Sequence, residues 1–424
     1  MYKTYDKCIF ALFVVFCALF YANSFRGVFI DVESHIPATI LAQKYGYDLA
    51  GYGLSFVSAD GVEHTYGAGA FEILDKNITP HSFSHYTSTI GLQGFIYAAI
   101  YQALSPFFDT LKPLYAINAL LNAAALSLLL VLIARIFSLG FGVVFACSLF
   151  APWVIKFNTS LYFSFTSFIL PSICAFSLYL VLFSTMSGGG DKEKVRGKLM
   201  ALFLGYGFCV ALRASLSYEF ITSIVAFSLS PFLIAALYSL LNKNTHCPSM
   251  KILPLKKSIL AFLLLLLASI LGFACVFIYH TYIRGGGDFL LGLKDIYERD
   301  FLRRMIGGKG ENFTHPLIIE SLNASIFNVI KTYLNFQPIK YLLPLCVFVI
   351  LKEQNTSYKS FYIALLVCFY LPALSWFIFG KAHSYVHTHF CFVLYYLGFV
   401  ASLMYIPAHS LYLTYKEKYA KTQT

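Results

Sequence analysis

Long apolar segments recur along the whole sequence and limit what the chain can fold into. Most of these runs have about 17 to 25 residues, the length that crosses a bilayer as a helix, and together they make up about half of the 424 residues. The chain is 58% hydrophobic and only 12% charged, whereas a soluble domain carries about 25% charged residues. The sequence therefore predicts an all-α, polytopic integral membrane protein.

We expect about ten transmembrane helices within one transmembrane domain, residues 1–424. The first apolar segment is too long for a signal peptide and lacks a convincing small-residue cleavage site, so we expect an anchor. The expected helices cover residues 8–30, 114–136, 139–156, 161–185, 199–214, 220–241, 258–282, 341–351, 361–380 and 390–413.

Lysine and arginine residues mark the short loops that we place in the cytoplasm. Four loops between apolar runs and the C-terminal tail are basic, and basic loops stay on the cytoplasmic side. Both termini are then cytoplasmic, provided that residues 89–107 lie in the outer interface as a helix instead of crossing. Two long extracytoplasmic loops with interfacial helices follow, at about residues 31–113 and 284–337. With no eukaryotic retention signal evident, we expect a bacterial inner membrane.

Several common functions do not fit these residues. The formal net charge of +11 comes from short loops and not from one basic face or arm, so nucleic acid is not an expected partner. Nine of the ten cysteines lie inside apolar segments and no Cys-x-x-Cys pair is present, which favours packing over a disulfide framework. The glycine runs at 188–190 and 285–287 match neither a P-loop nor a dinucleotide fingerprint.

Two acids and a histidine crowd the outer end of the first apolar segment. Asp31, Glu33 and His35 lie where a carboxylate loses hydration unless a partner, a substrate or a cation uses its charge. In an extended segment Asp31 and Glu33 point the same way, and such paired carboxylates can remove a proton from an acceptor hydroxyl or amine. A helix end closed by polar residues is the alternative.

A tight outer turn holds a second polar group, made of Arg213, Tyr218 and Glu219. Arg213 either pairs with Glu219 to close a helical hairpin or binds a phosphate, which its planar fork suits. Tyr218 can orient either arrangement. A phosphate at this turn would belong to an anionic substrate.

A third group contains Lys381, His383 and His387. The two histidines are spaced i and i+4, but the His-Glu-x-x-His pattern of a zinc enzyme is absent. We therefore favour a cationic cup for a phosphate over a metal site or a polar turn. A need for a divalent cation stays open.

Two further segments add candidate binding residues. His85 and Gln93 belong to a polar run that could bind a sugar or a head group, although a capped helix start explains its Ser and Thr equally well. Gln93 should then lie near the surface. Arg303 and Arg304 end an amphipathic segment, residues 288–305, that should lie flat on the membrane with its arginines toward head groups.

The layout around the acids resembles the GT-C class of polytopic membrane glycosyltransferases. The resemblance lies in the Asp31-Val32-Glu33 run after the first helix, a long first external loop that ends in an interfacial helix, and Arg135 at the end of the second helix. It implies a polyprenyl-phosphate-linked sugar as donor and an extracytoplasmic site. It also implies that Asp31 is the catalytic base, with Glu33 as its helper or an acceptor-binding group.

The sequence thus predicts sugar transfer from a lipid-linked donor to an acceptor that is a lipid, a glycan or a protein. The alternatives are a transporter or flippase of a lipid-linked saccharide, and a polymerase or ligase of surface polysaccharide. A transporter usually shows paired repeats and ionisable residues near mid-membrane. Here no repeat is visible and the charges gather at helix ends, which favours the enzyme.

Overall fold

The computed structural model describes residues 2–26, 32–62, 69–108, 110–187, 192–242, 247, 249–304 and 315–422. Within them, seven helices are long and apolar enough to cross a membrane. The architecture is almost wholly helical, with one pair of short strands, and it is that of an integral membrane protein. The seven helices are α1 (Tyr2–Asn23), α5 (Lys112–Ile136), α8 (Phe165–Ser184), α9 (Lys192–Leu216), α10 (Ile221–Leu241), α11 (Leu255–Arg284) and α17 (Thr356–Phe379).

Three bent helix pairs raise the number of possible spans in these ranges to ten. The first pair, α6 (Leu139–Ser148) and α7 (Pro152–Thr159), bends by 76°, where the sequence indicates one straight helix. The bend lies just before Pro152, because Ala151 has the extended backbone that a residue before proline prefers. The other pairs join α15 (Ile326–Leu334) to α16 (Gln337–Lys352) at 84°, and residues Thr388–Tyr396 to α20 (Phe399–Thr422) at 45°.

Aromatic side chains fill the centre of the bundle. The ring of Phe141 on α6 stacks on Phe369 of α17 with a centroid distance of 5.8 Å, and Phe145 stacks on Phe227 of α10 at 6.4 Å. Offset stacking at these distances adds to the gain from burying apolar area. The core therefore ties the middle of the chain to its C-terminal helices.

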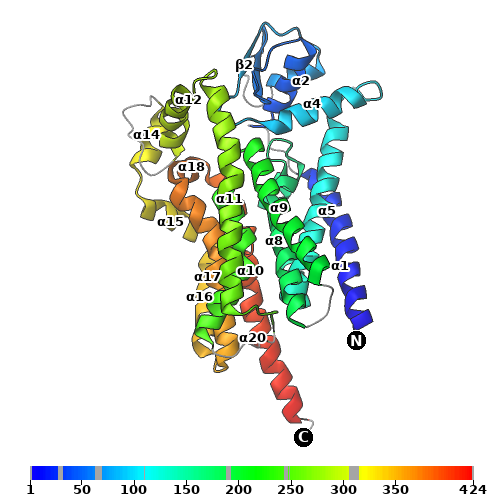
Figure 1. The fold of residues 1–424 in the computed structure, drawn as a ribbon, viewed down its shortest axis with the longest axis vertical. Helices are drawn as coiled ribbons and strands as arrows, with labels where there is room; N and C mark the ends of the chain where they lie inside the picture. The colour runs from blue at the N-terminus through cyan, green and yellow to red at the C-terminus, as the bar shows by residue number, and fades with distance from the viewer. Residues whose placement is uncertain are drawn as a thin grey trace.

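A small cap lies at the end of the molecule opposite both termini (Figure 1). It consists of α2 (His35–Lys44), β1 (Ser55–Ser58), α3 (Gly69–Asp75), β2 (Ser82–His85) and α4 (Leu92–Leu104). The two strands pair antiparallel, with Ser55 opposite His85. With 13 residues, α4 is shorter than a span and is not among the candidate spans.

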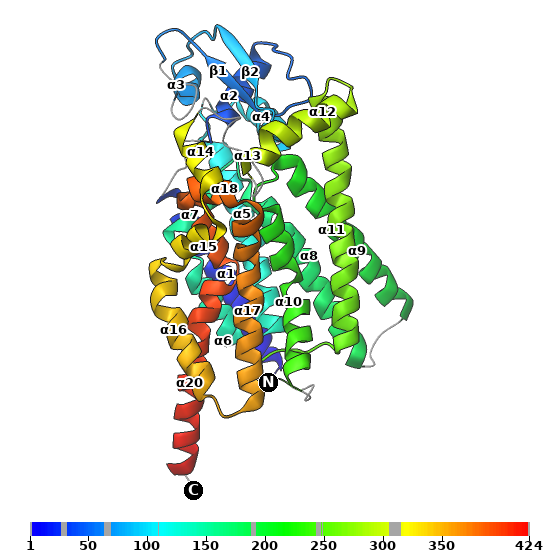
Figure 2. The same cartoon turned by 90° about the vertical axis from the view of Figure 1, so that its left-hand side faces the viewer.

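A helical arm folds from the end of α11 across the top of the bundle (Figure 2). It is made of α12 (Phe289–Asp295), the π-helical turn η3 (Ile296–Phe301) and α13 (Leu302–Arg304). The buried guanidinium of Arg284 fastens the arm by pairing with Asp295 and, at 3.4 Å, with Asp300. The arm thus approaches α14 (Pro316–Asn323) and α18 (Lys381–Val386), beneath the cap.

Candidate functional site

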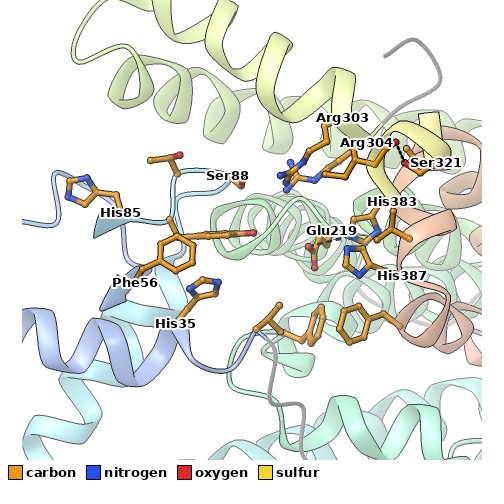
Figure 3. Close-up of a pocket in the computed structure, with 18 residues that line it drawn as sticks. His35, Phe56, His85, Ser88, Glu219, Arg303, Arg304, Ser321, His383 and His387 are labelled. Atoms are coloured by element: carbon orange, nitrogen blue, oxygen red, sulfur yellow. Dashed lines mark hydrogen bonds and ion pairs between the residues drawn. The ribbon is translucent and has the colours of Figure 1, made fainter. Parts of the chain in front are cut away.

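A polar cavity of about 370 Å³ lies between the cap, the arm, α18 and the turn that precedes α10. Figure 3 shows Arg303 and Arg304 above Glu219, with His383 and His387 beside it. His35 and Phe56 lie across the cavity, on the cap side. Residues from five distant parts of the sequence therefore meet around one space, and seven of the predicted binding residues line it: His35, His85, Glu219, Arg303, Arg304, His383 and His387.

A strained, clamped turn presents Glu219 to the cavity. Phe220, which follows it and caps the start of α10, has a left-handed backbone with a φ of 61° although it is not glycine. Such conformations cost free energy and persist where the surroundings hold them. Arg213 holds this one, because its guanidinium donates to the Glu219 carbonyl at 3.0 Å and to the Phe163 carbonyl at 2.8 Å.

The Glu219 carboxylate lies near the Arg304 guanidinium and two histidines, of which His387 is uncharged at neutral pH because burial lowers its pKa to about 3. His383 Nε2 is 3.5 Å from Glu219 Oε1. Burial by itself raises the pKa of Glu219, but the hydrogen bond and charge of His383, together with the charges of Arg304 and His387, lower that pKa to about 2. Glu219 is therefore ionised at neutral pH, and it holds positive charge on the cavity wall.

Arg304 reaches the cavity from the end of the arm. Its guanidinium donates to Asp300 Oδ1 at 2.9 Å, and the Ser88 hydroxyl donates to the same oxygen at 2.8 Å. Burial lowers the pKa of Arg304, whereas the charges of Asp300 and Glu219 raise it, and the net shift is upward. Asp300 was not among the predicted site residues. Its spacing of four residues before Arg304 on a helix was the one signal for it.

His35 supplies a neutral imidazole on the opposite wall. Its Nδ1 donates to the Ser55 carbonyl at 3.1 Å, which places the lone pair on Nε2. Burial lowers the pKa of His35 to about 4, so the ring stays uncharged at neutral pH. His85, at the rim, donates from Nε2 to the Asp48 carbonyl at 3.0 Å.

His383 and His387 leave polar atoms without partners. Their ring centroids are 4.6 Å apart, and the Nδ1 atom of each is buried with no hydrogen-bond partner among the described residues. Buried polar atoms in native proteins are nearly always paired, so these two nitrogens are an incompletely satisfied part of the cavity wall. Among all the residues that the structure describes, no group of three His, Cys, Asp or Glu residues is arranged to hold a metal ion.

Four predicted binding residues lie outside the polar cavity, and the first two bind main-chain groups. Arg213 clamps the turn through the Glu219 carbonyl, and the ion pair with the Glu219 carboxylate, one of the two alternatives that the sequence left open, is not among the salt bridges of the described residues. Lys381 donates to the carbonyls of Leu322 and Ala324 at 2.6 and 2.7 Å. Both lysine and arginine thus satisfy carbonyls that would otherwise be buried and unpaired.

The other two residues outside the polar cavity, Gln93 and Tyr218, contact groups of the protein. Gln93 is fully buried and donates to the Tyr162 carbonyl at 3.0 Å, so its expected position near the surface was wrong. The reason is the close approach of α4 to the loop between α2 and β1, where a Cβ on Gly94 would lie 1.6 Å from the Gly53 carbonyl oxygen. The Tyr218 hydroxyl is 2.9 Å from His280 Nδ1.

Of the two predicted catalytic acids, Asp31 and Glu33, only Glu33 belongs to the residues that the structure describes. Glu33 is fully buried away from the polar cavity, where its carboxylate binds the Ser160 hydroxyl and the backbone N–H groups of Leu161 and Tyr162, the latter at 3.1 and 3.2 Å. Burial raises the pKa of Glu33 to about 7. Asp31 lies outside the described residues, and Val32, which follows it, lines the cavity.

An apolar groove adjoins the polar cavity. Its upper hollow, of about 280 Å³, is lined by aromatic residues such as Phe273 and Phe277 and shares Ser88 and Arg304 with the polar cavity. Its lower hollow, of about 500 Å³, lies between α10, α11 and α17 and shares Phe273 and Phe379 with the upper one. The groove therefore runs along the bundle and ends at Arg304.

Scans of protein-family models, of curated proteins and of solved structures found no match to this chain. The class that the fold defines is a helical integral membrane protein with a polar cavity at one end.

Proposed function

We propose that this protein is a membrane glycosyltransferase that moves a sugar from a polyprenyl-phosphate-linked donor to an acceptor at the extracytoplasmic face of a bacterial inner membrane. The observation that carries the proposal is the junction at Arg304. There an apolar groove of two hollows, about 280 and 500 Å³, meets a polar cavity of about 370 Å³. An anionic lipid with a polar head group has the same order of parts.

Each part of such a donor finds a matching surface. The prenyl tail fits the groove, whose lining is almost entirely apolar, because hydrocarbon gains free energy by leaving water. The phosphate belongs beside Arg304 and Arg303, which line the cavity. A guanidinium fork binds phosphate oxygens with strong charge-assisted hydrogen bonds. The sugar then occupies the polar cavity, next to Glu219 and the two histidines.

The transfer step follows from this placement. An acceptor oxygen attacks the anomeric carbon, the bond from that carbon to the phosphate oxygen breaks, and the lipid phosphate leaves with the bonding electrons. Arginines in place beside the phosphate stabilise its growing charge more in the transition state than in the ground state. Ionised Glu219 can accept the hydrogen bond of the attacking hydroxyl. Asp31 remains the sequence-based prediction for the base that takes the proton.

The test uses purified protein in liposomes with a polyprenyl-phosphate-linked hexose that carries a radiolabel. We expect Arg304→Gln to weaken donor binding at least tenfold, since a charge-assisted hydrogen bond contributes about 1.5 to 3 kcal/mol. Arg299→Gln is the matched control, because Arg299 lies on the same arm with its side chain 76% exposed. It should bind donor like the parent protein.

Two results would contradict the proposal. One is equal donor binding by the Arg304 and Arg299 variants. The other is labelled lipid that crosses the bilayer without cleavage of the sugar–phosphate bond, which would identify a transporter or flippase. Loss of transfer in Asp31→Asn with donor binding kept would support the predicted base, whereas retained transfer would remove Asp31 from that role.

A further inference from the structure

A row of aromatic side chains leads from the rim of the polar cavity over the cap. The rings of Tyr45 and Phe83 are 6.4 Å apart, Phe83 and Tyr47 are 5.3 Å apart, and Tyr47 and His85 are 5.4 Å apart, all between centroids. His85 also lines the cavity. These four residues, the aromatic row, thus form a continuous path from the cap surface to the site.

The row is set apart from the surfaces that meet lipid. It lies on β2 and on the loop after α2, and these elements belong to the cap at the end of the molecule farthest from both termini (Figure 2). Tyr45 is 44% exposed, and Tyr47, Phe83 and His85 are partly exposed. Contiguous apolar groups on a surface can form an interaction site, and here they lie on the cap.

Polar groups border the row. The hydroxyls of Tyr45 and Tyr47 make no hydrogen bond with any described residue, so both can bind a ligand. Lys44 Nζ lies 5.9 Å from the centre of the Tyr45 ring and donates to Asn77 Oδ1 at 2.9 Å. The Asp48 carbonyl, in the loop between α2 and β1, accepts a hydrogen bond from the His85 imidazole at 3.0 Å.

We infer that the aromatic row binds the acceptor, and that the acceptor is a saccharide chain; this inference rests on the proposed function. Sugar rings place C–H groups on one face, which pack on the negative face of an aromatic ring, and carry hydroxyls around the edge that hydrogen-bond polar neighbours. A row of rings suits successive sugar units. The unit at the His85 end would then place its terminal hydroxyl in the polar cavity.

The experiment measures saturation-transfer NMR of four neutral hexasaccharides, from the cello, malto, chito and manno series, with the protein in nanodiscs and no donor lipid. At least one should bind saturably to the parent protein. Tyr45→Ala combined with Tyr47→Ala should weaken that binding at least tenfold, while Tyr45→Phe with Tyr47→Phe keeps most of it. Tyr419→Ala, an exposed tyrosine on α20 at the opposite end, should have no effect.

Phe83 is left intact because it packs against the small apolar core of the cap, so its loss could unfold the cap. The inference is overturned if none of the hexasaccharides binds saturably, or if the double alanine variant binds like the parent. It is also overturned if vesicles of anionic lipid compete for the row.

The outcome is separable from that of the proposed function. Hexasaccharide binding at the row without any donor binding at Arg304 would keep the saccharide site and remove the transferase. Donor binding at Arg304 without hexasaccharide binding at the row would keep the transferase and remove the saccharide site. If the protein binds both the donor and the hexasaccharide, labelled sugar should move onto the bound hexasaccharide. The Tyr45→Ala, Tyr47→Ala variant should then have a higher KM for the hexasaccharide and an unchanged kcat. Transfer onto a chain would favour a polymerase or ligase of polysaccharide.

Discussion

Three buried ionisable side chains, Glu33, Arg213 and Lys381, bind main-chain groups. Glu33 illustrates this, since its carboxylate accepts from two backbone N–H groups and the Ser160 hydroxyl at the start of the segment that leads into α8. Tyr115 of α5 adds a hydroxyl at 3.4 Å. Leaving such donors unpaired in a buried place would cost about 1 to 3 kcal/mol each. Glu33 thus fixes the segment that forms the floor beneath the cap.

The raised pKa of Glu33 predicts how the free energy of unfolding changes with pH. Its folded pKa of about 7 lies above the ordinary value of 4.5, so its protonation favours the folded state below pH 4.5, and this contribution is lost as pH rises through 7. The free energy of unfolding of the parent protein should therefore fall by about 3 kcal/mol relative to Glu33→Gln between pH 4.5 and 7. Parallel unfolding curves of the two proteins in detergent measure it. A constant difference across this range would contradict the assigned pKa.

The candidate site was predictable from sequence only in part. Charge at helix ends pointed to His383, Glu219 and Arg304, because a charged group at a membrane boundary needs a use. Nothing in the sequence separates these from Lys381 and Arg213, since that depends on which carbonyls the fold leaves unpaired. The same limit explains why Glu33 was expected beside a substrate and lies in a backbone network instead.

At the scale of elements, a close backbone contact fixes how α4 packs on the loop between α2 and β1 within the cap. Gly94 faces Gly53 so closely that a methyl group at either position would collide with backbone: the Cβ of residue 94 would lie 1.6 Å from the Gly53 oxygen, and the Cβ of residue 53 would lie 2.1 Å from the Gly91 oxygen. Backbone atoms cannot rotate away as a flexible side chain can.

Gly94→Ala should therefore destabilise the protein by about 1 to 3 kcal/mol or more and push α4 away from the loop. Gly197→Ala is the matched control, because Gly197 lies in α9 with nothing near its Cβ position. It should be neutral or stabilising by about 0.5 to 1 kcal/mol. The melting temperatures of both variants in thermal unfolding test this prediction. Equal melting temperatures would show that the close contact is not formed.

At the scale of the whole molecule, both termini lie at one end and the cap and polar cavity lie at the other (Figure 1). That arrangement suits a chain whose basic loops and tail stay on one side of a membrane. The apolar helices were predictable because length and composition alone decide them. The bends were not, since Ala151 and Gly398 act through local backbone conformation, extended in one and with a φ of 98° in the other.

The orientation itself is testable by labelling. Ser84→Cys places a thiol on exposed β2, and Lys418→Cys places one on exposed α20. A membrane-impermeant maleimide should react with Ser84→Cys in intact spheroplasts, and with Lys418→Cys only after the membranes are opened. The parent protein, with its native cysteines, gives the background. The reverse pattern would put the cavity in the cytoplasm and exclude an extracytoplasmic transferase.

The π-helical turn at Ile296–Phe301 has a consequence for how such a chain diverges in evolution. A π turn holds one more residue than an α turn, so one residue can be deleted there to restore α-helix while the residues after it, Arg304 included, keep their face. A deletion in an α-helical part of the arm would instead rotate everything after it by about 100° and turn Arg304 away. One codon lost in the π turn is therefore compatible with a guanidinium at the mouth of the groove, whereas one codon lost from α12 removes it.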